Sequence, residues 1–183
     1  MLLVEQKKSE NVAEFVLYMF QMEDLIRMFG FDLDLLMEGY VSKSLSNKAF
    51  EPQYRLWFKS VIEEMKSNAL EKEGHVEVVK ETIIELVYLH NTLQTIIKDE
   101  KYIGLCEQSK DAIEEFRQKA NMQGRHDVEV LFHAMYMKLQ LKIRKQVISE
   151  ETESAMDLMR IQLAHLSREY KRMYAGGFAP SPN

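Results

Sequence analysis

The chain has 183 residues and a mass of 21.6 kDa, which predicts one domain with a core of its own. Hydrophobic residues make up 46% and charged residues 29%, as in a soluble globular protein, and the scarcity of breaks (7 Gly, 3 Pro) favours long helices. The net charge of −5 lacks the basic face that nucleic acids require, so we expect no nucleic-acid binding.

The opening residues, MLLVEQKK, lack the basic segment followed by an apolar run that marks a signal peptide. No uncharged apolar run is long enough to cross a membrane. We therefore expect a cytoplasmic protein without membrane contact. The single cysteine, Cys106, allows no intramolecular disulfide, and its helical core spacing indicates a small buried side chain rather than a reactive thiol.

The stretch from Asn11 to Phe29 is apolar on nearly every side of a helix, so other helices or a second subunit must cover it. We predict a helix over 9–29 with Ser9 as its N-cap and Gly30 just past its end. An unpaired buried carboxylate is costly, so the polar residues of this helix must pair, reach solvent or bind a ligand. These residues form either a polar pocket or a network that fixes packing, and in the second case Glu23 and Asp24 pair with Arg27. The candidate residues are Glu14, Tyr18, Gln21, Glu23, Asp24 and Arg27.

Asp32 is expected to cap a short second helix, and the small polar residues 42–47 read as a loop. From Pro52 onward, apolar spacings of three and four predict five long helices, over about 52–73, 76–97, 102–120, 128–148 and 150–173. Five long helices joined by short turns predict an all-α, antiparallel up-and-down helical bundle with small crossing angles. The N-terminal helix and the short second helix are added to this bundle. We expect residues 1–174 to form this single domain and residues 175–183 to be a flexible tail.

The helix over 128–148 carries two polar stripes, and Asp127 is expected to cap it. The first stripe is expected to face solvent and consists of Lys138, Lys142 and Lys145. The second stripe consists of His126, Glu129, His133, Gln140 and Arg144. Its first three residues could present ligands to a metal ion from one helical face. Because this order is not the Glu-x-x-His of carboxylate-bridged bundle sites, we expect an exposed or hydrogen-bonded stripe, with metal binding as the alternative.

Two further histidines lie at informative positions. His90 occupies a seam position in the heptads of 76–97, where we expect a buried ring with satisfied nitrogens; a general base in a cavity is the alternative. His165 lies on the flank of the last helix with Leu158 and Ile161, and this flank is a candidate dimer surface.

Two stretches resemble a known family. The segment ENVAEFVLYMFQMEDLIR (10–27) resembles the N-terminal signature of a Bacteroidetes-restricted, all-helical family named only for its unknown function, and VISEET (147–152) with LAHLSREY (163–170) matches it further along. Relatives often carry Tyr and Trp where this chain has Phe15 and Phe20, so two polar groups are missing here. The resemblance covers most of the chain and implies an all-α fold in the bacterial cytoplasm, without a substrate, cofactor or catalytic residue.

No phosphate-binding glycine loop, nucleophile elbow or paired-cysteine motif occurs, so no reaction class and no cofactor are indicated. The leading hypothesis is a non-enzymatic scaffold or protein-interaction module, a homodimer that buries apolar surface of the N-terminal helix and of the last helix. The alternative is a small-ligand or metal-binding bundle that uses the carboxylates of the N-terminal helix or the stripe of His126, Glu129 and His133. An enzyme ranks third.

Overall fold

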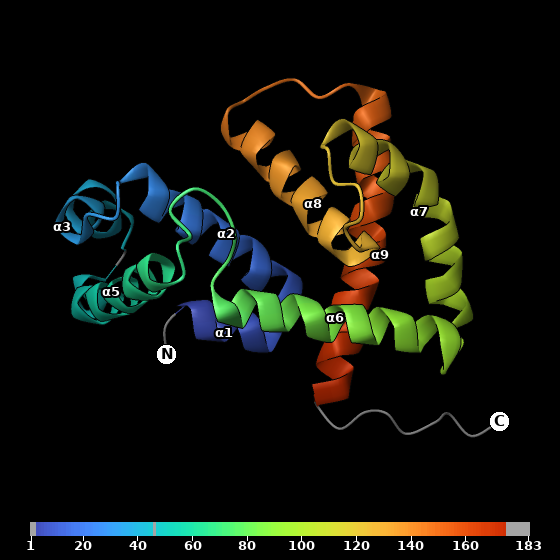
Figure 1. The fold of residues 1–183 in the computed structure, drawn as a ribbon, viewed down its shortest axis with the longest axis horizontal. Helices are drawn as coiled ribbons and strands as arrows, with labels where there is room; N and C mark the ends of the chain where they lie inside the picture. Colours follow the sequence, from blue (N-terminus) through green and yellow to red (C-terminus); the bar gives the residue numbers. More distant parts are fainter. Residues whose placement is uncertain (1–2, 46, 175–183) are drawn as a thin grey trace.

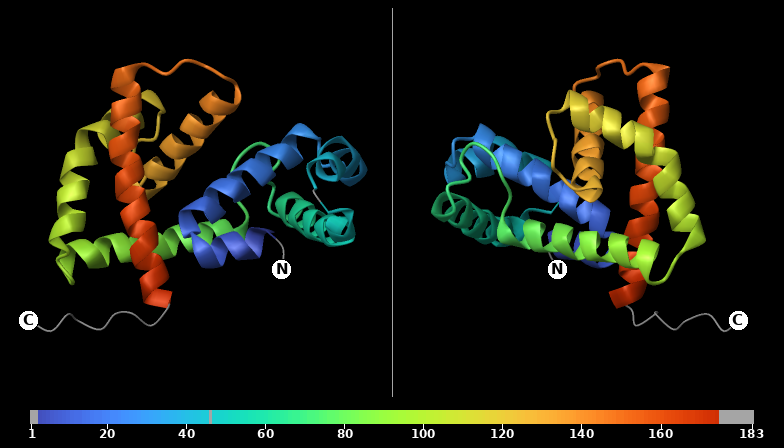
Figure 2. Two further views of the ribbon diagram at one scale, coloured as in Figure 1. Left: turned by 180° about the vertical axis from the view of Figure 1, so that it is seen from behind. Right: turned by 45° about the vertical axis from the view of Figure 1, so that its right-hand side comes forward.

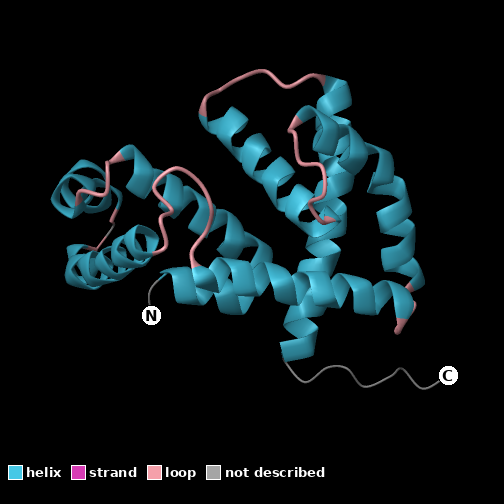
Figure 3. Ribbon diagram, viewed as in Figure 1, coloured by secondary structure: helices cyan, strands magenta, loops and turns pink. Residues whose placement is uncertain are grey.

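The computed structural model describes residues 3–45 and 47–174, which form helices and loops without a strand (Figure 3). The helical elements are α1 (Leu3–Glu10), α2 (Val12–Met28), α3 (Leu33–Leu36), η1 (Met37–Val41), α4 (Ser42–Ser44), η2 (Lys48–Phe50), α5 (Glu51–Ser67), α6 (Glu77–Thr95), α7 (Glu100–Lys119), α8 (Asp127–Ile143) and α9 (Glu150–Tyr174). The predicted all-α fold is confirmed. None of the described helices has both the length and the apolar character that a membrane crossing requires. The predicted tail, 175–183, lies outside the described residues.

Helix α2 joins the two sides of the molecule (Figure 1). It packs against α6, α8 and α9, and at its other end it reaches the region of α3 and α5. Nine of its side chains are buried: Val12, Ala13, Phe15, Val16, Met19, Phe20, Met22, Glu23 and Ile26. The apolar side chains of this added N-terminal helix are therefore covered by other helices of the bundle. A helix that is apolar all round is wrapped by its neighbours, and here those neighbours belong to the same chain.

The bundle is organised along α9, whose 25 residues make it longer than the other described helices. Helices α7 and α8 pack on either side of α9, and α6 crosses it near its C-terminal end (Figures 1 and 2). The heptad spacing favoured small crossing angles, but α6 also contacts α2, so it spans the bundle instead of running beside α9. Helix α5 packs on α3 and η1, and its buried Phe58 and Met65 belong to the same hydrophobic core as the buried residues of α2.

Two helices replace the single N-terminal helix that we predicted. Asn11 separates them and caps α2, because its Oδ1 accepts a hydrogen bond from the backbone N–H of Ala13 at 3.1 Å. Ser9, the predicted N-cap, donates instead to the carbonyl of Gln6. Both residue types cap helices well, so the local sequence did not decide between them. A distant residue does: Ser167 of α9 donates a hydrogen bond to Asn11 Oδ1 at 2.7 Å.

The substitution Asn11→Ala is expected to lower the free energy of unfolding by about 1–2 kcal/mol, because it removes both the cap and the acceptor for Ser167. Ser9→Ala, two residues away, should change it by less than about 0.5 kcal/mol. Urea unfolding followed by circular dichroism measures both. Equal losses in the two variants would show that the cap is wrongly assigned.

The short second helix begins as predicted, with the Asp32 side chain accepting from Leu35 N–H at 3.0 Å. Helical structure then continues through the π-helical turn η1 and α4 as far as Ser44, so the predicted loop at 42–47 starts later than expected. Gly39 has a packing role. A Cβ at this position would lie 2.6 Å from the ring of Phe29, so a larger residue would push the ring away.

Helix α8 differs from its prediction in three ways. Its N-cap is His126 rather than Asp127, and it ends at Ile143 rather than at Ile148. Lys138, predicted to face solvent, is only 6% exposed. Its ammonium group lies 2.7 Å from Glu153 and 3.0 Å from Asp157. Helix α9 covers this one position of the predicted solvent stripe and supplies the two carboxylates, whereas Lys142 and Lys145 are exposed as predicted.

Candidate functional site

The most deeply buried charged residue of α2 is Glu23, which is 0% exposed. One carboxylate oxygen accepts from His75 Nδ1 at 2.6 Å, and the other accepts from the backbone N–H of Val76 at 2.8 Å. The ring of Phe20 stacks on the imidazole of His75, with centroids 3.9 Å apart. Val76 is the N-cap residue of α6, so Glu23 binds the backbone where α6 begins.

Asp24 and Arg27 extend this contact on both sides. The Arg27 guanidinium pairs with Asp24 at 3.0 Å and donates to the carbonyls of Leu70 and Gly74, which lie in the connection between α5 and α6. On α8, the hydroxyl of Tyr136 donates to Asp24 Oδ2 at 2.6 Å. Burial raises the pKa of Tyr136, so this hydroxyl stays protonated as a donor. We term Glu23, Asp24 and Arg27 the α2 clamp, because they hold the connection and α8 against α2.

The other three candidate residues of α2 do not join the clamp. Glu14 is exposed and pairs with Lys7 at 3.1 Å. Tyr18 is half-buried, its ring centroid lies 6.5 Å from that of Trp57, and burial raises its pKa. Gln21 is half-buried. The six residues therefore divide into a clamp near the end of α2 and separate positions along the helix, and they do not line one pocket.

The three candidate metal ligands have different roles in the structure. His126 and Glu129 form a capping box: His126 Nδ1 accepts from Val128 N–H, and Glu129 accepts from His126 N–H at 3.0 Å. His133 is exposed, with its ring 5.6 Å from that of Phe20. In residues 3–45 and 47–174, no group of three or more His, Cys, Asp or Glu side chains is arranged to hold a metal ion.

Sequence reasoning did not single out His75, although it is the partner of the most buried carboxylate. It follows the exposed charged run 71–73, which reads as a loop, and its partner Glu23 is 52 positions earlier in the chain. The available signal was indirect: a carboxylate in the middle of an apolar helix needs a donor, and a histidine just before a helix start can provide one.

A second polar network lies inside the bundle. His90 is buried as predicted, with Nδ1 bonded to the hydroxyl of Tyr102 at 2.8 Å and Nε2 bonded to Gln94 at 2.6 Å. Further along the core, Gln162 of α9 accepts from Ser109 and donates to the sulfur of Cys106. Burial raises the pKa of Cys106 to about 11, so the thiol is protonated and unreactive at neutral pH. These contacts link α6, α7 and α9.

The predicted dimer flank on α9 is only partly exposed. His165 is buried, and its Nε2 lies 3.3 Å from Asp99, the N-cap residue of α7. The expectation that His165 faces a second subunit is wrong because α7 covers it. Leu158 and Ile161 remain partly exposed.

A second group of exposed apolar side chains lies where the end of α9 meets α6. Tyr88, Ile97 and Met173 line a groove of about 460 Å³ between α6 and α9. Ile84 lies one turn before Tyr88 on α6, and Tyr174, which follows Met173, lines a neighbouring groove. We term Ile84, Tyr88, Ile97, Met173 and Tyr174 the α6/α9 patch. Their exposed fractions range from 36% for Met173 to 70% for Tyr88.

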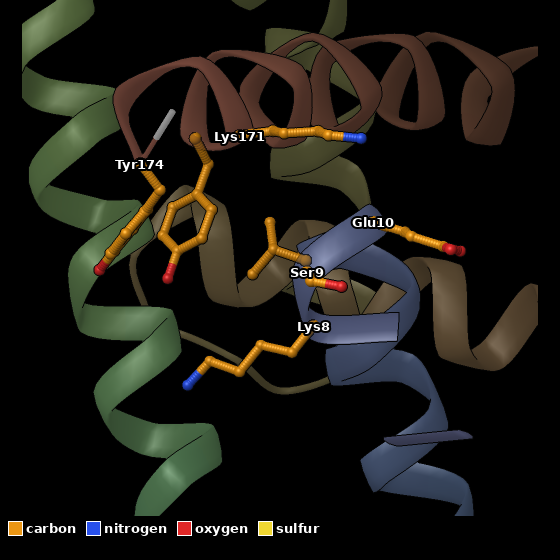
Figure 4. A pocket seen from close by; sticks show the side chains of 7 residues that line it. Lys8, Ser9, Glu10, Lys171 and Tyr174 are labelled. Atoms are coloured by element: carbon orange, nitrogen blue, oxygen red, sulfur yellow. The ribbon is translucent and has the colours of Figure 1, made fainter. Parts of the chain in front are cut away.

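A second groove, of about 600 Å³, lies beside this patch, between α1 and the end of α9. Figure 4 shows the side chains of Lys8 and Tyr174 on the side of the groove nearest α6, with Glu10 and Lys171 on the opposite side. Tyr170 forms the boundary between the two grooves, because its hydroxyl donates to Glu85 of α6 at 2.5 Å. The end of α9 is thus a ridge with a groove on each side.

The family model described as "Domain of unknown function (DUF4924)" matches residues 1–177. The chain belongs to this family. This confirms the prediction that the chain belongs to an uncharacterised family. The family description assigns no reaction, ligand or partner. No curated protein and no solved structure matches the chain. Any function of this DUF4924 protein has to be argued from its geometry.

Proposed function

We propose that this protein is a non-enzymatic interaction module that acts as a homodimer through the α6/α9 patch. The observation that carries the proposal is the run of large apolar side chains at this place. Scattered exposed apolar residues are ordinary, but a contiguous apolar surface with polar residues around it marks an interaction site. Tyr88 and Ile84 project from one face of α6, and Met173 and Tyr174 project from the adjoining end of α9.

The shape of the patch supports a second copy of the chain as the partner. A two-fold interface uses the same surface on both subunits, so that surface must contain both projections and recesses. Here the end of α9 is a projection with a groove on each side. A two-fold rotation can place the α9 end of each copy against a groove of the other.

The charges around the patch support the same partner. Two basic side chains and one acidic side chain, Lys8, Lys171 and Glu10, border it on the side of α1, whereas Glu81 and Glu85 lie on α6. A two-fold axis through the patch brings the basic side of one copy to the acidic side of the other, which favours association and fixes its orientation. The polar clusters inside the molecule are engaged in holding helices together, which agrees with a binding role rather than a catalytic one. The expected bacterial cytoplasmic setting stays a prediction.

Light scattering coupled to size-exclusion chromatography tests the dimer. We expect twice the 21.6 kDa chain mass for the native protein and a mass near 21.6 kDa for Tyr88→Glu, because a carboxylate at the centre of the patch would be buried without a partner. Leu56→Glu is the matched control, since Leu56 is also 70% exposed but lies on α5, and it should remain dimeric. A native protein that elutes as a monomer, or equal loss of dimer in both variants, would overturn the proposal.

A further inference from the structure

A third recess lies away from the α6/α9 patch, where the start of α2 meets α8 and α9. It has a volume of about 490 Å³, within the range of roughly 300–1,000 Å³ typical of small-molecule sites. Apolar side chains from all three helices line it, among them Leu17, Leu139 and Leu163. We term this recess the α2/α8/α9 cleft. Because its walls come from three helices of the bundle, its shape is fixed by the fold.

The cleft also has a buried charge in its wall. Lys138 is 6% exposed, and its ammonium group is held by Glu153 and Asp157. Burial alone would lower the pKa of Lys138, but hydrogen bonds to these carboxylates outweigh it and hold the pKa above its ordinary value. A buried ion pair of this kind is weak support for stability, since apolar residues in its place often do as well. Its position in the wall of a cleft suggests another use.

The remaining charges around the cleft are balanced. Lys142 follows Lys138 by one turn of α8, and Arg160 follows Asp157 on α9. Glu14 of α2, which also pairs with Lys7, lies on the same recess. Three cations and three carboxylates therefore border an apolar floor: Lys138, Lys142, Arg160, Glu14, Glu153 and Asp157. A simple anion would lie near the negative charges of Glu14 and Glu153. A simple cation would lie near the positive charges of Lys142 and Arg160.

We propose that the α2/α8/α9 cleft binds a small zwitterion with an apolar side chain, of the chemical class of a free apolar amino acid. Its carboxylate lies toward Lys142 and Lys138, its ammonium group toward Glu14 and Glu153, and its side chain against Leu17 and Leu139. Each charged end then meets the opposite charge, and the apolar portion leaves water. This proposal does not depend on the dimer, because none of these residues belongs to the α6/α9 patch.

The test is a titration of L-leucine into the full-length protein, followed in ¹H–¹⁵N spectra. We expect saturable shifts around Leu17, Leu139 and Leu163 with a Kd of about 1 mM or lower. 4-Methylpentanoate, which lacks the ammonium group, and 3-methylbutylamine, which lacks the carboxylate, should bind at least about tenfold more weakly. No saturable shift, or equal binding of either analogue, would overturn the proposal.

A matched pair of variants locates the site. Lys142→Gln should weaken L-leucine binding about tenfold or more, since a charge-assisted hydrogen bond is lost. Lys145→Gln removes the same charge three positions later, outside the residues that line the cleft, and should leave the Kd unchanged. Both positions are exposed, so both variants should fold, which circular dichroism checks. Equal effects of the two substitutions would show that binding lies elsewhere.

Discussion

Glu23→Ala is expected to lower the free energy of unfolding by about 3 kcal/mol, a loss typical of removing one partner from a buried polar pair. The substitution leaves the Val76 N–H and the His75 imidazole, on which the Phe20 ring stacks, without their acceptor. For a chain of this size, the melting temperature should fall by roughly 6–12 °C. Thermal and urea unfolding of the purified protein measure both quantities.

Glu14→Ala is the matched control for this prediction, because it removes the same residue type from the same helix. The Glu14 side chain is 59% exposed and contacts Lys7 and the side-chain amide of Asn11 at the surface, so we expect a change below about 0.5 kcal/mol. Glu23→Gln should fall between the two, since it keeps the volume and one acceptor. If Glu23→Ala costs no more than Glu14→Ala, the α2 clamp does not hold the fold together.

The buried His90 should make the protein less stable in mild acid. Burial, together with the nearby ring of His126, lowers the pKa of His90 from 6.5 to about 4, against the opposing effect of Asp127. The unfolded chain binds a proton below about pH 6.5, whereas the folded chain does not until about pH 4, so stability is fully present above pH 6.5 and is lost as the pH falls toward 4. Between about pH 7.5 and about pH 5, His90 accounts for a loss of about 2 kcal/mol.

His90→Gln isolates this contribution. The variant loses the bond to Tyr102 and should be less stable than the native protein at both pH values. Between about pH 7.5 and about pH 5, however, its free energy of unfolding should fall by about 2 kcal/mol less than that of the native protein. Urea unfolding at the two pH values gives the required difference. The same pH dependence in the variant and the native protein would mean that His90 is not the group that resists protonation.

The long helices could be predicted because their signal is local and repeated. Apolar spacing from Pro52 to Met173 predicted α5–α9, and Gly30 and Asp32 marked an end and a start that the structure confirms. The arrangement of the helices could not be read in this way. Nothing within α6 indicates that it crosses α9, because that geometry follows from its contact with α2.

The candidate residues show the same limit. The sequence indicated that Glu23 needs a partner, but His75 comes from a loop that carries no pattern of its own. Lys138 looked solvent-exposed because its own helix supplies no acid for it; the carboxylates of Glu153 and Asp157 arrive with α9. Burial and pairing of a charged residue depend on the neighbouring helix, and single-helix periodicity contains no information about that neighbour.

The central claim is that α2 is internal to one chain and that the α6/α9 patch is where two chains meet. Hydrogen exchange of the intact protein at low and high concentration tests it most directly. We predict that the amides of residues 84–97 and 170–174 exchange more slowly at high protein concentration than at low concentration. The amides of α2 should exchange slowly at both concentrations. A concentration dependence confined to α2, with none over 84–97 and 170–174, would contradict the claim.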